Sequence, residues 1–453
     1  MQRDAIDFEK EDTGTLFRKM LIPTLISSVA SMVMTITDGI FVGHGLGSSA
    51  LAAVNIVAPL WLIGSGVGLM FGMGASVVAS IHLAKDKLKA ARLNLTQSIL
   101  FSSLLVAAVA VLVCVFRNET LRLLGCPDDL KPLAVRYMLG FIPFLPFNVL
   151  LTSGAFFVRL DGSPRYAMAS TAISAVLNLT FDYLFIFVFH LGILGAAIAT
   201  SLGSLVGAAM IILYLSNPKH KLRFIKIKAS LKSMRLSFRN LRYMIHLGLS
   251  SFLADASISF MMLCGNYVFG ILGGDDLIAA FSVVCYFFPI VFMIYEAVGM
   301  SVQPIISYNH AKSREGKKHK ALRLALFTNL GIGIPISLMS IFFPDIVATL
   351  FLQAGTQAYT YTMEGLPLFA SGFAIYAINI TTIIYYQSIE KASRATIITI
   401  ARGIVFMAIS FILLSQFFGI RGAWFAVPCT EVLTLLLMLF YCCRTNILRR
   451  KQA

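Results

Sequence analysis

Charged residues are scarce in this chain of 453 residues. Only 13% are Asp, Glu, Lys or Arg, whereas 58% are hydrophobic and the mean hydropathy is +0.83. A typical soluble domain has about 25% charged residues, so this composition excludes a water-soluble globular protein. The sequence therefore predicts an integral membrane protein.

Motifs for catalysis, nucleotide binding and metal binding are also missing. The sequence has no G-x-S-x-G, P-loop or H-E-x-x-H motif and no paired C-x-x-C, and its seven histidines are scattered. The seven cysteines lie mostly in apolar segments, without the spacing of a metal site or a disulfide framework. We therefore expect no enzyme, no metal site of this kind and no cofactor. Any pumping must draw on an ion gradient.

What the chain does have is long apolar runs. The first twenty residues are rich in charged side chains. They lack the apolar core and the cleavage site of a removable signal peptide. At about 20 apolar residues per crossing, the sequence predicts an all-α membrane protein with twelve transmembrane helices. The runs lie near 16–43, 49–80, 90–116, 131–158, 164–189, 193–215, 240–271, 276–308, 321–343, 365–389, 395–416 and 420–443.

Lysines and arginines predict the orientation, because they concentrate in cytoplasmic loops. With both termini inside, all but five of the 37 are assigned to the inner side. The five outer residues are Arg117, Arg122, Lys131, Arg136 and Arg421. The net charge of +16 is then explained by topology and by contact with the anionic headgroups of the lipid bilayer. We expect no nucleic-acid partner.

The two halves of the chain repeat each other. "GLGSSALAAV" (45–54) is similar to "LGGDDLIAAF" (272–281), and "LGILGAA" (191–197) is similar to "FGIRGAW" (418–424), both at an offset of 227 residues. Six spans in each half give both halves the same orientation, so we expect two pseudo-symmetric six-helix lobes. The predicted domains are an N-terminal lobe (1–215), a basic cytoplasmic linker (216–239) and a C-terminal lobe (240–453).

Small residues at four-residue spacing predict close packing of helices in the first half, since backbones can approach where no side chain intervenes. The two stripes are Gly64, Gly68 and Gly72, and Ala199, Gly203 and Gly207.

Four polar residues mark a candidate ion site in the first half. A carboxylate near the middle of a bilayer costs about 2.5–3.5 kcal/mol on insertion scales, yet Asp38 and Asp182 both lie inside apolar runs. Asn178 lies one turn before Asp182 on the same helix face, and Thr200 lies in the next helix. If these helices converge, the site takes a proton or a sodium ion. The alternative is that Asp38 caps a neighbouring helix or stabilises a kink.

The second half has its own embedded polar residues. Glu296, Tyr295 and Gln303 are candidates for a substrate cavity that attracts cations, although Glu296 could instead stabilise a kink near Gly299. For Asp255 and Glu431 a structural role is the stronger interpretation.

These segments resemble the multidrug and toxic compound extrusion (MATE) family of bacterial transporters over nearly the whole chain, about 16–443. The most specific stretches are "TDGIFVGHGLGSSALAAVNIVAPLW" (37–61), "VRLDGSPRYAMASTAISAVLNLTFDYLFIF" (158–187), "GILGAAIAT" (192–200), "EAVGMSVQPIISYNHAK" (296–312) and "YYQSIEKASRATIITIAR" (385–402). The resemblance implies a multi-pass protein of the bacterial cytoplasmic membrane that exports small lipophilic cations by antiport against protons or sodium ions.

The same resemblance implies site residues. In the similar branch of the family, an acidic residue of helix 1, an Asn and an Asp of helix 5 and a Thr of helix 6 form the ion site, and these fall on Asp38, Asn178, Asp182 and Thr200. Other branches use acidic residues of helices 7 and 10. Here helix 10 has no carboxylate and Asp255 stands too early in helix 7, so the chain departs from that pattern.

Two other functions stay open. A flippase for a lipid-linked precursor would share the bilobal plan, but it would need several Arg or Lys at membrane depth for a pyrophosphate, and this chain has almost none. A membrane enzyme or a receptor has no catalytic motif or signalling domain to support it. Nothing in the sequence requires an oligomer, and we expect a monomer.

Overall fold

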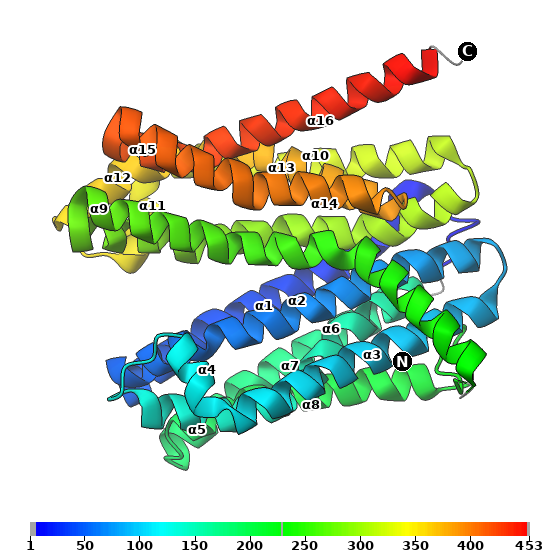
Figure 1. Cartoon of the computed structure of the whole chain (residues 1–453), viewed down its shortest axis with the longest axis horizontal. Helices are drawn as coiled ribbons and strands as arrows, with labels where there is room; N and C mark the ends of the chain where they lie inside the picture. The colour runs from blue at the N-terminus through cyan, green and yellow to red at the C-terminus, as the bar shows by residue number, and fades with distance from the viewer. Residues whose placement is uncertain (1–5, 228–229, 451–453) are drawn as a thin grey trace. The chain divides into compact units, whose positions relative to one another are not determined.

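The computed structural model describes residues 6–227 and 230–450, and within these ranges every regular element is a helix. The predicted all-α class is therefore confirmed. Figure 1 labels the helices along the chain. The first are α1 (Thr13–Leu46), α2 (Ser48–Ala84), α3 (Leu88–Val115), α4 (Arg117–Leu123), α5 (Lys131–Phe141), η1 (Ile142–Phe144), α6 (Leu145–Leu160), α7 (Pro164–Tyr183), η2 (Leu184–Val188) and α8 (Ile193–Ser216).

The second series begins with the longest helix. It comprises α9 (Leu231–Ala311), α10 (Glu315–Phe342), α11 (Pro344–Phe351), α12 (Gln357–Ala370), α13 (Phe373–Ser388), α14 (Ala392–Ile400), η3 (Ala401–Phe406), α15 (Met407–Trp424) and α16 (Ala426–Arg450). Helix α9 is two helices joined end to end, because the backbone leaves the helical region at Gly273 and Gly274.

Ten helices of the described chain are long and apolar enough to cross a membrane. Nine of the ten overlap one predicted hydrophobic run each; the run 49–80, for example, corresponds to Ser49–Ala84. The tenth, Ala392–Trp424, covers the run 395–416 and the first residues of the run 420–443. The pair α12 and α13, bent by 45°, makes an eleventh span if it is counted as one, and Ala426–Tyr441 is a shorter apolar helix. The count of twelve stays a prediction.

The chain divides into two compact units. The first reaches Phe252 and also takes in Pro304–Lys318, and the second comprises Leu253–Gln303 and continues from His319. The first unit therefore holds α1 to α8 and both ends of the long α9, and the second holds the middle of α9 and most of the later helices. The candidate ion site lies entirely within the first unit.

Residues with positive φ recur at the spacing of the sequence repeat. This left-handed backbone favours glycine, since a Cβ atom strains it. Three pairs of such residues are 227 positions apart: Gly47 and Gly274, Asp86 and Ser313, and Gly192 and Gly419. The repeat observed in the sequence thus extends to the turns of the backbone.

The predicted close packing at small residues is confirmed. At Gly72 of α2, an added Cβ atom would lie 3.0 Å from the Cα of Ser153 in α6. At Gly203 of α8, it would lie 2.6 Å from the carbonyl oxygen of Ser174 in α7. Any larger side chain would force these helices apart.

The segment after α8 is tied to the helices on either side of it. Asp161, at the end of α6, accepts hydrogen bonds from the hydroxyl of Tyr214 (2.8 Å) and from the backbone N–H of Leu222 (2.7 Å). The Nε of Arg92 in α3 donates to the carbonyl of Lys221 at 2.8 Å. This anchoring brings the start of α9 beside α3.

Candidate functional site

Helices α1, α7 and α8 bring together the four residues of the predicted ion site. The Nδ2 of Asn178 donates a hydrogen bond to the Oγ1 of Thr200 at 3.2 Å. The carboxyl of Asp38 lies close enough to Asp182, Asn178 and Thr200 to interact with all three side chains. The convergence on which the prediction depended is therefore present, while the role of the residues stays a prediction.

Two local features of the sequence allow these helices to pack closely. Gly203 leaves no side chain between α7 and α8, so that its position lies directly against Asn178. On the other side, Phe41 of α1 makes an edge contact with Phe187 at 5.6 Å between ring centroids. Phe187 belongs to η2, a π-helical turn that directly follows α7, the helix of Asp182. Such widened turns are frequent at functional sites.

The site is rich in acceptors and largely buried. Asp182 and Asn178 are 0% and 1% exposed, whereas Asp38 is partly exposed. Within the described residues, the Oδ1 of Asp38, both carboxylate oxygens of Asp182 and the Oδ1 of Asn178 accept no hydrogen bond of good geometry.

Two ionised carboxylates this close would repel each other, and burial away from water would add a cost of several kcal/mol. A proton or a hard monovalent cation between the oxygens removes both penalties. The arrangement can therefore hold one small positive charge and release it when water or a basic group gains access.

Tyr137 of α5 belongs to the surroundings of this site, although no sequence pattern selects it. It lies close enough to Asp38 and Asp182 to be coupled electrostatically with both. Its ring stacks on Phe141 at 6.1 Å. Periodicity and spacing do not mark this tyrosine, because its proximity to the two aspartates arises only from the packing of α5.

The three substrate-cavity candidates lie along α9 in different surroundings. Tyr295 is fully buried, and its hydroxyl donates to the carbonyl of Phe373 at 3.2 Å. Gln303 is also buried, whereas Glu296 is partly exposed. Glu296 lies near enough to Tyr376 to affect it electrostatically. Their role in binding substrate stays a prediction.

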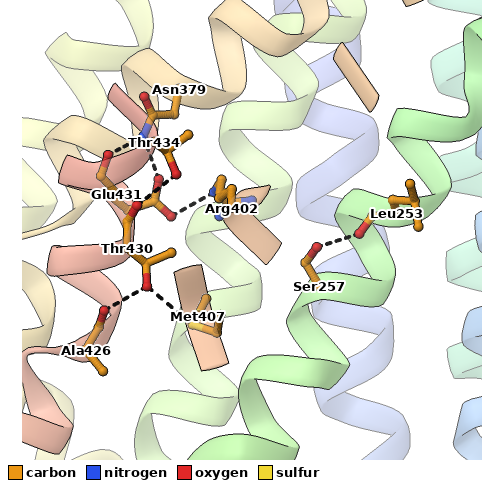
Figure 2. A network of polar contacts seen from close by, with 9 residues as sticks. All are labelled: Leu253, Ser257, Asn379, Arg402, Met407, Ala426, Thr430, Glu431 and Thr434. Atoms are coloured by element: carbon orange, nitrogen blue, oxygen red, sulfur yellow. Dashed lines mark hydrogen bonds and ion pairs between the residues drawn. The ribbon is translucent and has the colours of Figure 1, made fainter. Parts of the chain in front are cut away.

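A second buried polar cluster lies in the other unit, and Figure 2 shows Asn379 and Arg402 pointing toward Glu431 of α16. The Nε of Arg402 donates to the Oε1 of Glu431 at 2.8 Å, and the Nδ2 of Asn379 donates to its Oε2 at 2.8 Å. The guanidinium of Arg402 also lies 4.3 Å from the centre of the Tyr376 ring. Arg402 and Glu431 are 3% and 0% exposed, so this is a fully buried ion pair.

The sequence indicated a structural role for Glu431 but did not identify its partner. A signal was present, since an arginine inside an apolar run requires an opposite charge. With its charge used by Glu431, Arg402 is not free to bind an anionic substrate.

Comparison with known proteins adds three findings. Residues 23–184 and 250–412 each match the MatE family model. The chain is 24% identical over 435 residues to the multidrug export protein MepA of Staphylococcus aureus, covering 94% of this chain and 92% of that protein. The MepA protein of Staphylococcus saprophyticus is 24% identical over 436 residues with the same coverage.

Solved structures share the fold. A multidrug resistance MATE family transporter of the MOP superfamily, in an outward-facing conformation, superposes with a TM-score of 0.89 at 20% identity and 98% coverage of both chains. A MOP superfamily transporter from Pyrococcus furiosus gives a TM-score of 0.88, also at 20% identity and 98% coverage of both chains. A Vibrio cholerae MATE transporter gives 0.87 at 21% identity, covering 97% of this chain and 98% of the other.

The two matches to the family model begin 227 residues apart, at 23 and 250, which is the offset of the sequence repeat and of the paired turns. Together they cover well over half of the chain. The protein therefore belongs to the MatE family of transporters.

Proposed function

We propose that this protein exports lipophilic, cationic compounds by antiport against protons or sodium ions. The observation that carries the proposal is a close pair of carboxylates, the buried Asp182 and the partly exposed Asp38, with Asn178 and Thr200 beside it. Several oxygens of this group accept no hydrogen bond of good geometry within the described chain. The names of the relatives, multidrug export protein and multidrug resistance transporter, support drugs as the exported class.

The coupling follows from charge. With both aspartates ionised, the site favours the state that holds a cationic substrate in the protein. When a proton or sodium ion enters from outside, it neutralises the pair and removes that preference. A ligand can shift a conformational equilibrium only by binding the two states differently, and the charge of this pair provides the difference.

Helix α1 is the element that would respond to that change. It carries Asp38 and also has Pro23 in its interior, where a proline removes one helical hydrogen bond and favours a bend. Gly39, the neighbour of Asp38, faces open space, since an added Cβ atom would meet nothing within 4 Å. We propose that α1 bends at one of these positions as the protein alternates between inward-facing and outward-facing states.

The proposed topology is twelve spans in two six-helix lobes, with both termini in the cytoplasm and the protein monomeric in the bacterial cytoplasmic membrane. Ten long spans, the bent pair of α12 and α13, and the shorter helix at Ala426–Tyr441 support this count. The turns and family matches that recur after 227 residues support two related lobes.

The test is ethidium efflux by the purified protein in liposomes, with either a pH gradient or a sodium gradient imposed. The variants are Asp38→Asn and Asp182→Asn, each of which removes one charge while keeping the shape of the side chain. Asp345→Asn is the matched control, because Asp345 lies exposed on α11. Efflux by the wild type and the control that is lost in both site variants supports the proposal.

Other results would change it. Efflux driven only by sodium assigns the coupling ion as sodium, and efflux driven only by pH assigns the proton. Normal efflux by Asp38→Asn and Asp182→Asn would exclude the proposed site. If no drug moves under either gradient, the lipid-precursor flippase becomes the function to test.

A further inference from the structure

A cavity of about 460 Å³ with polar side chains in its wall lies in the first unit, and none of its lining residues belongs to the ion site. It is formed by the end of α2, the first turns of α3 and the start of α9. Its polar wall contains Asn94 and Gln97 from α3, and Ser237, Arg239 and Asn240 from α9. The tether between Arg92 and the segment before α9, described above, holds the two helices beside each other.

Hydrogen bonds within the wall orient its amide groups. The Nε2 of Gln97 donates to the Oγ of Ser237 at 2.6 Å. The Nδ2 of Asn240 donates to the Oε1 of Gln97 at 2.6 Å and also to the Oδ1 of Asn94. These bonds engage the oxygen of Asn94 and leave its Nδ2 group without a partner in the wall.

That Nδ2 group is the unusual feature of the cavity. Asn94 is 3% exposed, and its Nδ2 donates no hydrogen bond to the described residues. A buried donor without an acceptor costs about 1–3 kcal/mol, and an oxygen atom of a molecule in the cavity would relieve that cost.

The charge of the surroundings defines the class of that ligand. Arg239 lines the cavity and is exposed, and the described lining residues include no Asp or Glu. Arg235 and Arg242 lie exposed on the same stretch of α9. A lining that offers a neutral amide donor and one guanidinium, without a carboxylate, suits an oxyanion such as a phosphate.

The same stretch of α9 also exposes large apolar side chains. Met234, Leu236 and Phe238 are 53%, 46% and 61% exposed. A helix that combines exposed apolar residues with arginines is typical of the boundary between lipid headgroups and acyl chains. A phosphate that reaches the cavity at this place is therefore more readily part of a phospholipid than a free ion.

We propose that this cavity binds the phosphate of an anionic phospholipid, with the Nδ2 of Asn94 donating a hydrogen bond to a phosphate oxygen and Arg239 pairing with its charge. The acyl chains of that lipid lie along the exposed apolar side chains of α9. The site lies on the proposed cytoplasmic side, and its existence does not depend on which compound the transporter exports.

The experiment measures the melting temperature of the purified full-length protein in detergent as phosphatidylglycerol is added. Phosphatidylcholine is added in parallel as a zwitterionic lipid, and inorganic phosphate as a free oxyanion. The variants are Arg239→Gln and Asn94→Asp, the second of which places a negative charge where the phosphate would lie. Arg117→Gln is the control, because Arg117 is exposed in α4 and far along the chain from the cavity.

We expect phosphatidylglycerol to raise the melting temperature of the wild type and of Arg117→Gln in a saturable way. In Arg239→Gln and Asn94→Asp the half-saturating concentration should rise about tenfold or more, as expected for the loss of a charged hydrogen bond. Because Arg239 is exposed, its variant folds even if Asn94→Asp does not, and it suffices for the test.

Two results would overturn the proposal. Equal responses of the wild type, Arg117→Gln and Arg239→Gln to phosphatidylglycerol would show general attraction of anionic lipid and no site. A saturable rise with inorganic phosphate that phosphatidylglycerol does not reproduce would make the ligand a soluble oxyanion. Ethidium efflux is not a readout here, so failure of this proposal leaves the proposed transport function untouched.

Discussion

Breaking the buried ion pair between Arg402 and Glu431 should destabilise the protein more than any substitution of an exposed charge. Both side chains are at most 3% exposed and are joined at 2.8 Å. Removing one partner leaves the other as an uncompensated charge in a dry interior, which costs about 3–5 kcal/mol. We expect either Arg402→Met or Glu431→Gln to lower the melting temperature by about 3–5 °C, since the entropy of unfolding grows with chain length.

The Glu431→Gln variant has a second penalty that the structure identifies. The Nδ2 of Asn379 donates to the Oε2 of Glu431 at 2.8 Å, and the introduced amide would place its own donor on one of the two oxygens that Arg402 and Asn379 now use. The double variant Arg402→Met with Glu431→Leu removes both charges. Asn379 then keeps its bond to the backbone carbonyl of residue 431, at 2.9 Å.

The double variant should therefore be more stable than either single variant and lie within about 2 kcal/mol of the wild type. The assay is thermal unfolding of the detergent-purified protein, followed by loss of the monodisperse species on size exclusion. Asp345→Asn, an exposed change, is the control and should leave the melting temperature unchanged. Single variants as stable as the wild type, or a double variant whose loss equals the sum of the singles, would refute the reasoning.

Three other substitutions test the first unit. Gly203→Val should reduce both efflux and stability, since the space beside Asn178 admits no side chain; efflux in liposomes and the melting temperature are the measurements. Tyr137→Phe removes only a hydroxyl near the aspartate pair, so the pH dependence of efflux should change while the melting temperature moves by about 1 °C at most. Asp161→Asn weakens the charged hydrogen bond from Tyr214 and should cost about 1–3 kcal/mol, visible as a lower melting temperature with normal insertion.

Each of these three substitutions has a matched control or a contradicting result. Gly331→Ala in α10 serves as the control for Gly203→Val, because an added Cβ atom there meets nothing within 4 Å and should be tolerated structurally. An unchanged pH profile for Tyr137→Phe would remove Tyr137 from the ion site. A melting temperature of Asp161→Asn equal to that of the wild type would mean that the anchor of the segment after α8 contributes no stability.

Much of the fold could be predicted from the sequence, because the bilayer sets the length and hydropathy of each crossing segment independently of its neighbours. Each crossing needs about 20 apolar residues whatever packs beside it, so the run 193–215 could be located from hydropathy alone and corresponds to Ile193–Ser216. The repeat was equally visible, since duplicated segments keep their similarity at a fixed offset. The small-residue stripes also predicted close contact, although they could not say that Gly203 would face α7 and Gly72 would face α6.

The polar residues separate what was predictable from what was not. A carboxylate inside an apolar run is visible in the sequence because its cost is local, and this was enough to select Asp38 and Asp182. Bringing them together required three helices to converge, a condition that the resemblance to the family implied and the geometry of α1, α7 and α8 meets.

Partners that lie far apart along the chain were decided only by the tertiary structure. Arg402 and Glu431 are 29 positions apart on different helices, and Tyr137 comes near the aspartates through the packing of α5. The oxygen of Asn94 accepts a hydrogen bond from Asn240, 146 residues away, which no local pattern indicates. Hydropathy and periodicity indicate whether a helix lies in lipid or in water. The contacts above depend on which faces of the helices pack together, and this is determined only by the tertiary structure.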